Sequence, residues 1–155
     1  MIDKKSFKKA VAIPLEKHGF AKKGQSWYLD GKDAIAVLNL QKNDWADEYF
    51  INIGIWIKYL REAEYPKAHE CHLSHRVESL FPQEMETIHN GCSLEKGTND
   101  ALAKLASFIE IKLVPFLREC TEADNLKKMM AMGRFKLGFV HISAKFFLEN
   151  SGVST

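Results

Sequence analysis

The chain has 155 residues, 46% of them hydrophobic, so it has the usual size of one domain and enough apolar side chains for a core without disulfides or metal. Its 22 Lys and Arg against 20 Asp and Glu leave a net charge of +2, well short of the strongly basic balance of a dedicated nucleic-acid binder. The three cysteines, Cys71, Cys92 and Cys120, are an odd number at irregular spacings, which argues against a secreted disulfide framework.

The chain begins with a predicted helix. Its apolar residues recur at helical spacing, at Phe7, Ala10, Val11 and Leu15. Asp3 or Ser6 can cap the start of this helix, and Gly19 can end it. Pro14 lies inside the pattern, so we expect a bend there or an end near Ile13.

Three predicted strands follow and form an antiparallel meander. Residues 26–29 have a strand composition and run into Asp30-Gly31, a strong hairpin signal before the second strand at residues 34–42. After a loop, the third strand covers residues 49–58. Amides alternate with aliphatic residues in the second and third strands. Because side chains alternate faces along a strand, the sheet should have one aliphatic face and one amide-bearing face.

A fourth strand is predicted at residues 69–81, because that segment fits period two better than period 3.6. One face would carry Cys71, Leu73, His75 and Val77, and the other His72, Ser74, Arg76 and Glu78. Residues 61–67 are charged and include a proline, so they are predicted to be a loop or a short helical excursion. Residues 83–97 are predicted to be a loop, since Asn90-Gly91 and Gly97 are typical turn signals.

The C-terminal half is predicted to be helical. Thr98 caps a helix with a long apolar stripe, made by Leu102, Leu105, Ala106, Ile109, Leu113, Phe116 and Leu117. Pro115 should kink its last turn. Thr121 with Asp124 three positions on is typical of a capping box for a further helix. A last helix is expected within the Phe-rich residues 135–149.

These elements predict a single α+β domain over residues 1–150, an antiparallel meander of about four strands packed against helices mainly from the C-terminal half. Residues 151–155 are expected to be a disordered tail. The first residues turn polar at once without a secretory h-region, and no apolar stretch reaches the roughly 20 residues of a membrane helix. We therefore expect a cytoplasmic protein with no membrane partner.

Four short segments of the first half of the chain resemble a known family. They are Gly19-Phe20 after a short helix, Asn39-Leu40-Gln41-Lys42, the strand at residues 50–55, and Cys71-His72-x-x-x-Arg76. In order and spacing they resemble the DUF4304 family, mostly bacterial proteins of unassigned function. The resemblance implies a small α+β domain, and it carries no activity, cofactor or catalytic residue to this chain.

The richest concentration of reactive side chains in the sequence is a candidate metal cluster. It consists of His69, Cys71, His72 and His75, with His89 and Cys92 further on. Imidazole and thiolate are natural zinc ligands, but the spacing matches no established zinc finger, so we expect no metal and no cofactor. Cys71 and His72 could also be a nucleophile and its base. Neighbouring strand residues point to opposite faces, however, which argues against that pair.

The amide-bearing face is where we expect function. It would collect Asn39, Gln41, Asn52, Trp56, His72, Ser74 and Arg76. Amides supply donors and acceptors, Arg a fork for carboxylate or phosphate, and Trp a stacking plane. We expect a non-enzymatic binding or interaction module whose partner is a protein or a small acidic ligand.

Three alternatives remain open on the sequence. The same face could be an ordinary solvated surface, or be partly covered by residues 83–97. It could also carry a small hydrolase or transferase site, in which His72 and Arg76 do acid/base and anion-stabilising work. The oligomeric state is undetermined, because the phenylalanines of the tail, Phe139, Phe146 and Phe147, could seal a dimer instead of packing within the monomer.

Overall fold

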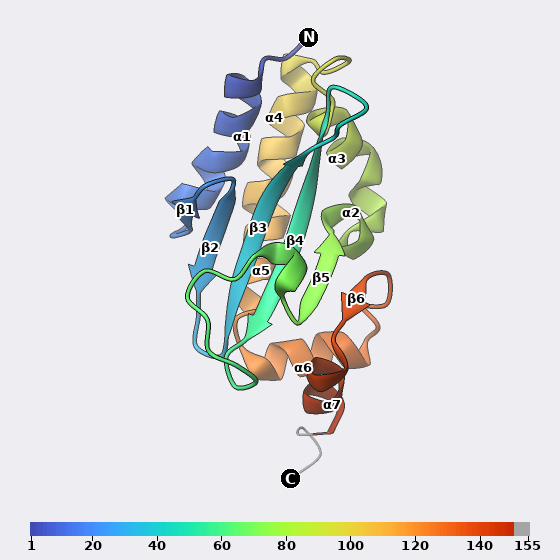
Figure 1. Ribbon diagram of the computed structural model, residues 1–155. Coiled ribbons are helices and arrows are strands. Elements are labelled where there is room, and N and C mark those ends of the chain that lie inside the picture. Colours follow the sequence, from blue (N-terminus) through green and yellow to red (C-terminus); the bar gives the residue numbers. More distant parts are fainter. Residues whose placement is uncertain (151–155) are drawn as a thin grey trace.

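A computed structural model describes residues 1–150 of the chain (Figure 1). Within these residues there is one sheet of six antiparallel strands in the order β1-β2-β3-β4-β5-β6. Each strand pairs with its neighbour in the chain, so the sheet is a continuous meander. The tail predicted at residues 151–155 lies outside the described residues.

The strands confirm the α+β class, but the sheet is larger than the four strands predicted. They are β1 (Ala21–Lys23), β2 (Ser26–Asp30), β3 (Ala34–Lys42), β4 (Tyr49–Ile57), β5 (Leu73–Arg76) and β6 (Phe139–Val140). β1 and β6 were missed because segments of three and two residues are too short to show a periodicity.

Most of the described helices lie from Val77 onward, but helices are not confined to the C-terminal half, because the first of them lies near the N-terminus. They are α1 (Lys4–Lys17), α2 (Val77–Leu80), α3 (Met85–Cys92), α4 (Asn99–Phe108), α5 (Val114–Glu119), α6 (Ala123–Ala131) and α7 (Ile142–Asn150). Two short 3₁₀ turns, η1 (Ala68–Glu70) and η2 (Pro82–Glu84), and a π turn, η3 (Ile109–Leu113), complete the fold. None of the helices described is long and apolar enough to cross a membrane.

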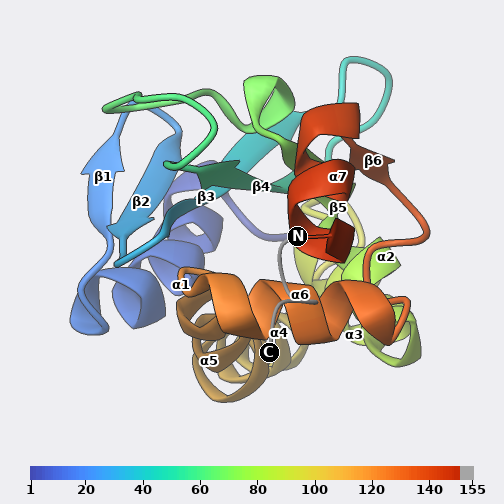
Figure 2. The same ribbon diagram turned by 90° about the horizontal axis from the view of Figure 1, so that it is seen from below.

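The main core lies between the sheet and the helices α1, α4 and α5, which all cover the same face (Figure 2). β3 and β4 each send four aliphatic side chains into it, Ala34, Ala36, Leu38 and Leu40 from β3, and Ile51, Ile53, Ile55 and Ile57 from β4. All eight are at most 3% exposed. The predicted aliphatic face is thereby confirmed, since alternate residues of one strand share a face.

α1 runs through Pro14 to Lys17, so the helix does not end near Ile13, while the alternative of a bend at Pro14 stays a prediction. The Asp3 carboxylate caps the helix by accepting a hydrogen bond of 2.7 Å from the Ser6 N–H. Proline removes only one helical hydrogen bond, and the helix is pressed onto the core by Phe7, Val11 and Leu15, all fully buried. Packing therefore overrides the local cost of the proline.

The predicted strand at residues 69–81 proved to be three elements. η1 precedes a short strand, β5, and α2 begins already at Val77. Cys71 does not share a face with Leu73 and Val77 as predicted, because it lies in a separate apolar cluster on the other side of the sheet. The alternation holds only inside the four residues that pair with β4.

The segment predicted as a loop, residues 83–97, contains the helix α3. Its Asn90-Gly91 pair indicated a turn, but Gly91 has a packing role. A Cβ at Gly91 would lie 2.5 Å from the Cβ of Leu105, so only glycine allows α3 to approach α4 this closely.

Helix α4 begins as predicted, with the Thr98 hydroxyl accepting a hydrogen bond of 3.0 Å from the Ala101 N–H. Helix α4 continues directly into η3, which is followed by α5, the helix that contains Pro115. In η3 the Val114 N–H donates a hydrogen bond to the Ile109 carbonyl, five residues back. The predicted capping box of α6 was wrong. Thr121 donates its hydroxyl to a carbonyl of α5, and the Asp33 carboxylate of the β2–β3 turn accepts the Ala123 N–H at 2.8 Å.

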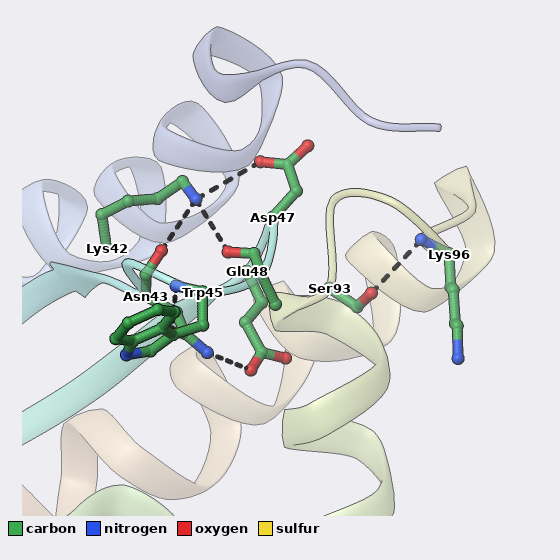
Figure 3. A network of polar contacts seen from close by, with 8 residues as sticks. Lys42, Asn43, Trp45, Asp47, Glu48, Ser93 and Lys96 are labelled. Carbon is green, nitrogen blue, oxygen red and sulfur yellow. Dashed lines mark hydrogen bonds and ion pairs between the residues drawn. The ribbon is translucent and has the colours of Figure 1, made fainter.

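The loop between β3 and β4 is tightly organised (Figure 3). The Lys42 ammonium donates to the carbonyls of Asn43 and Ala46, at 3.1 and 2.9 Å, and lies 3.6 Å from the Asp47 carboxylate. The Asn43 side chain accepts the Trp45 N–H at 2.9 Å. These bonds hold the backbone while the Trp45 side chain is 95% exposed.

The Phe-rich tail forms both β6 and α7, where one helix was expected. Ala144 and Leu148 carry α7 into the main core, whereas Phe139 and Phe146 are 53% and 69% exposed. Phe147 stacks on Tyr59 with ring centroids 5.0 Å apart. Phe139 and Phe146 therefore lie at the surface, whereas Phe147 is partly buried and packs against the main core.

Candidate functional site

The outer face of the sheet, opposite α1, α4 and α5, is divided into a covered part and an open part. Residues 58–72, including η1, cross over the covered part (Figure 2). They close a second apolar cluster made by Tyr28, Ile35, Val37, Trp56, Ala68 and Cys71. The cover therefore comes from this segment and not from residues 83–97, the alternative considered from the sequence.

Gly54 allows the cover to rest directly on β4. A Cβ at Gly54 would lie 2.7 Å from the Cys71 sulfur and 2.9 Å from the Ala68 Cα. The Ser74 hydroxyl also donates a hydrogen bond of 2.7 Å to the Ala68 carbonyl. These contacts hold η1 close above β4, where Ala68 and His69 form one wall of the open part.

The open part is a groove of about 1020 Å³ that crosses the sheet. Its floor is polar, with Ser26 from β2, Asn39 and Gln41 from β3, and Asn52 from β4. β1 and residues 65–69 line one region of the groove, and β5, α2 and Gly138 another. No Asp or Glu belongs to this lining.

Strand register produces the central row of the groove, which we call the cross-strand row. Lys23 pairs with Ser26, Ser26 with Asn39, Asn39 with Asn52, and Asn52 with Arg76. Directly paired residues of antiparallel strands point to the same face. The row therefore runs across five strands with a cation at each end and neutral polar side chains between them.

Hydrogen bonds along this row fix the amides. Asn39 Nδ2 donates to the Ser26 hydroxyl at 3.0 Å, and Asn52 Nδ2 donates to Asn39 Oδ1 at 3.2 Å and to Gln41 Oε1 at 2.9 Å. Within residues 1–150, Gln41 Nε2 and Asn52 Oδ1 have no hydrogen-bond partner. One donor group and one acceptor are thus held in place for a ligand.

Three permanent cations, Lys23, Lys67 and Arg76, line the groove. The Lys23 ammonium lies 4.1 Å from the centre of the Tyr65 ring, and the Arg76 guanidinium carbon lies 3.8 Å from the centre of the Phe50 ring. In the described part of the chain none of the three forms an ion pair. Elsewhere five lysines are paired with carboxylates, namely Lys17, Lys42, Lys58, Lys104 and Lys112. The groove is thus lined by three cations that have no carboxylate partner among the described residues.

Five of the seven site residues expected from the sequence line this groove, namely Asn39, Gln41, Asn52, Ser74 and Arg76. Trp56 and His72 do not. Trp56 is 8% exposed and donates its indole N–H to the Arg61 carbonyl at 2.7 Å. His72 packs 4.4 Å from the Trp56 ring, and its Nδ1 accepts the Ile57 N–H at 2.9 Å. Burial lowers the pKa of the His72 imidazole, and nearby His141 and Arg61 lower it further.

The residues considered as metal ligands are dispersed. His75 Nε2 bonds the Phe135 carbonyl at 3.0 Å, His89 pairs with Glu78 at 3.0 Å, and the Cys71 thiol donates to the Lys67 carbonyl at 3.4 Å. Across residues 1–150 no group of three His, Cys, Asp or Glu is placed to share a metal ion. Burial raises the pKa of the Cys71 and Cys92 thiols to about 12, so neither is a thiolate near neutral pH.

Comparison with known proteins bears on the same part of the chain. The family model for the domain of unknown function DUF4304 matches residues 11–119, more than half of the chain. The chain belongs to the DUF4304 family. The DUF4304 match begins inside α1 and ends with α5, so it includes β1 to β5 and the whole cross-strand row. No curated protein and no solved structure matches the chain.

Several groove residues of this DUF4304 domain were not predicted as binding residues, namely Lys23, Tyr65 and Lys67, together with His69 and His75, which the sequence indicated only as candidate metal ligands. Lys23 had a usable signal, because Gly24-Gln25 forms a two-residue turn between the paired residues Lys23 and Ser26. The segment around Tyr65 and Lys67 carried none, since irregular backbone has no periodicity from which its position could be deduced.

Proposed function

We propose that this DUF4304 domain is a non-enzymatic binding module that holds an anionic ligand or partner in the groove on the outer face of its sheet. The observation that carries this proposal is the set of three cations, Lys23, Lys67 and Arg76, that line the groove with no carboxylate among its lining residues. A surface that served only solubility would gain from mixing charges of both signs. Cations without carboxylate partners, beside preformed hydrogen-bonding groups, favour an anionic ligand.

Arg76 is the residue best suited to contact the anion. Phe50 supports its guanidinium at 3.8 Å, and the guanidinium N–H groups make no hydrogen bond within residues 1–150. A guanidinium can bind a carboxylate or phosphate through two parallel hydrogen bonds, and an aromatic neighbour reduces the freedom that it loses on binding.

Support for binding over catalysis comes from the histidines. The hydrolase or transferase alternative used His72 with Arg76, but His72 is buried against Trp56, outside the groove, and its Nδ1 is occupied by the Ile57 N–H. His75 and His69 do line the groove; His75 is 6% exposed with its Nε2 bonded to the Phe135 carbonyl, and His69 is exposed. No Asp or Glu of the lining can orient either ring as a general base or share in acid/base work.

We also propose a cytoplasmic location. All three cysteines are buried free thiols, which suits a reducing compartment. A bacterial source is proposed on the family resemblance alone.

Isothermal titration calorimetry with three probes tests the binding proposal. The probes are citrate, inorganic pyrophosphate and a peptide of eight glutamates, titrated into wild type, Arg76→Gln and Lys5→Gln. Lys5 is exposed on α1, on the opposite side of the sheet, so both variants lose one charge but only Arg76→Gln alters the groove. We expect at least one probe to bind wild type and Lys5→Gln equally, and Arg76→Gln about tenfold more weakly, the loss of one charge-assisted contact. No binding of any probe, or equal weakening in both variants, would refute the proposal.

A further inference from the structure

We infer that the ligand is an extended acidic peptide segment of a partner protein, which lies across the strands with an acidic side chain at each end of the cross-strand row. This inference rests on the proposed anion-binding function and adds the class and the length of the ligand.

The length follows from the register. Lys23 on β1 and Arg76 on β5 are four strand spacings apart, because Ser26, Asn39 and Asn52 lie between them in direct pairing. At about 4.8 Å per spacing their Cα atoms are roughly 19 Å apart. A single phosphate or carboxylate can reach only one end. An extended peptide advances about 3.3 Å per residue, so two acidic side chains about six residues apart match both ends.

The groove floor at the middle of the cross-strand row, where Gln41 lies beside Asn52, suits a peptide backbone. Gln41 Nε2 offers N–H donors and Asn52 Oδ1 offers an acceptor, and both amides are held by the hydrogen bond between Asn52 Nδ2 and Gln41 Oε1. Every peptide unit presents one carbonyl and one N–H. A peptide crossing the groove floor can therefore accept a hydrogen bond from Gln41 Nε2 with a carbonyl and donate one to Asn52 Oδ1 with an N–H. These two hydrogen bonds need no charged side chain on the peptide.

The aromatic residues favour a peptide over a single-stranded nucleic acid, which would need open rings on which bases stack. The Phe50 ring carries the Arg76 guanidinium, and the Tyr65 ring carries the Lys23 ammonium. Tyr28 is 8% exposed. These rings support the cations and leave no row of free faces.

Fluorescence polarisation with labelled peptides tests the spacing. Each peptide carries two glutamates on a neutral Ser/Ala background, placed two, four, six or eight residues apart, so that net charge is constant. We expect the affinity of wild type to be highest at a separation of about six and at least fivefold lower at two. The preference should disappear in Lys23→Gln and in Arg76→Gln, and persist in Lys5→Gln. A urea midpoint unchanged from wild type shows that each variant is folded.

The outcomes separate this inference from the function on which it rests. Peptides that bind equally at all separations, yet lose affinity in Arg76→Gln, would refute the two-ended peptide and keep the anion-binding groove. A labelled oligothymidylate of eight nucleotides that binds more tightly than every peptide, with loss in Arg76→Gln, would also refute the peptide and assign the groove to single strands. Failure of every probe to bind would refute both proposals.

Discussion

The two faces of the sheet use the same strands under opposite constraints. On β3, Leu38 is fully buried against the helices, while its neighbour Asn39 is half-buried on the outer face and hydrogen-bonded to Ser26 and Asn52. The inner face is stabilised by the removal of apolar surface from water, which is not directional. The outer face is organised by hydrogen bonds, each with a small net contribution to stability but a fixed geometry. The inner face therefore stabilises the protein, and the outer face can be specialised for a ligand.

The outer face repeats this contrast on a smaller scale. Where residues 58–72 cover it, the side chains of Ile35 and Val37 are apolar and buried; where it is open, Asn39 and Gln41 continue the same strand with amides. The boundary lies between Val37 and Asn39, which are successive residues on one face. A change of side-chain class at that point separates a second core from a candidate binding surface.

The largest expected effect comes from breaking the inner face. Leu38→Ala should lower the free energy of unfolding by about 2–5 kcal/mol, because Leu38 is fully buried in a central strand and its loss leaves a cavity. Asn39→Ala, one residue away, should cost about 1 kcal/mol for its lost hydrogen bonds. Urea unfolding at pH 7.5 measures both, and equal losses would contradict the division between the faces.

Next in size is a change at the covered part of the outer face. Gly54→Ala should lower the free energy of unfolding by about 1–3 kcal/mol, since its Cβ would lie 2.7 Å from the Cys71 sulfur and overpack the cluster. Faster amide hydrogen exchange should appear in residues 66–72 but not in α4. Ser74→Ala, which removes one hydrogen bond to Ala68, is a milder control. Unchanged exchange in residues 66–72 would show that the cover does not depend on Gly54.

A smaller effect is expected from pH. Burial lowers the pKa values of His72 and His75, so the folded state binds protons less readily than the unfolded chain. Their stabilising contribution is complete above the unfolded pKa of about 6.5 and is lost as the pH falls through the lowered folded values. Wild type should therefore unfold at lower urea at pH 5.5 than at pH 7.5. His72→Asn with His75→Gln retains hydrogen-bonding groups and should flatten this dependence; an unaltered slope would assign it to other groups.

The smallest effect is expected at the loop that joins the two central strands. Trp45→Ala should change the free energy of unfolding by no more than about 0.5 kcal/mol, because the side chain is 95% exposed and the loop is held by Lys42 and Asn43. It should also remove most of the acrylamide-quenchable fluorescence, since Trp27 and Trp56 are 1% and 8% exposed. A large loss of stability would mean that the indole packs in solution.

Local features were predictable where the physical cause lies within a few residues. The cap of α4 at Thr98 and the alternation of β3 and β4 follow from neighbouring side chains. The prediction failed where a residue far away in the chain determines the local structure. Gly91 marks a contact with Leu105 and not a turn, and the cap of α6 comes from Asp33 in the β2–β3 turn. Pro14 failed as a helix terminator for the same reason, because the packing of α1 outweighs one lost hydrogen bond.

The candidate site likewise has a part that local sequence predicted and a part that depends on tertiary structure. By itself the amino-acid sequence determined that Asn39, Gln41, Asn52 and Arg76 share one face, because side-chain direction along a strand alternates with period two. Only the tertiary structure decided that Lys23 lies opposite Arg76 at the far end of a row of paired residues, and that residues 58–72 cover the remainder of that face. Both depend on pairing and packing between segments far apart in the chain, for which no local periodicity exists.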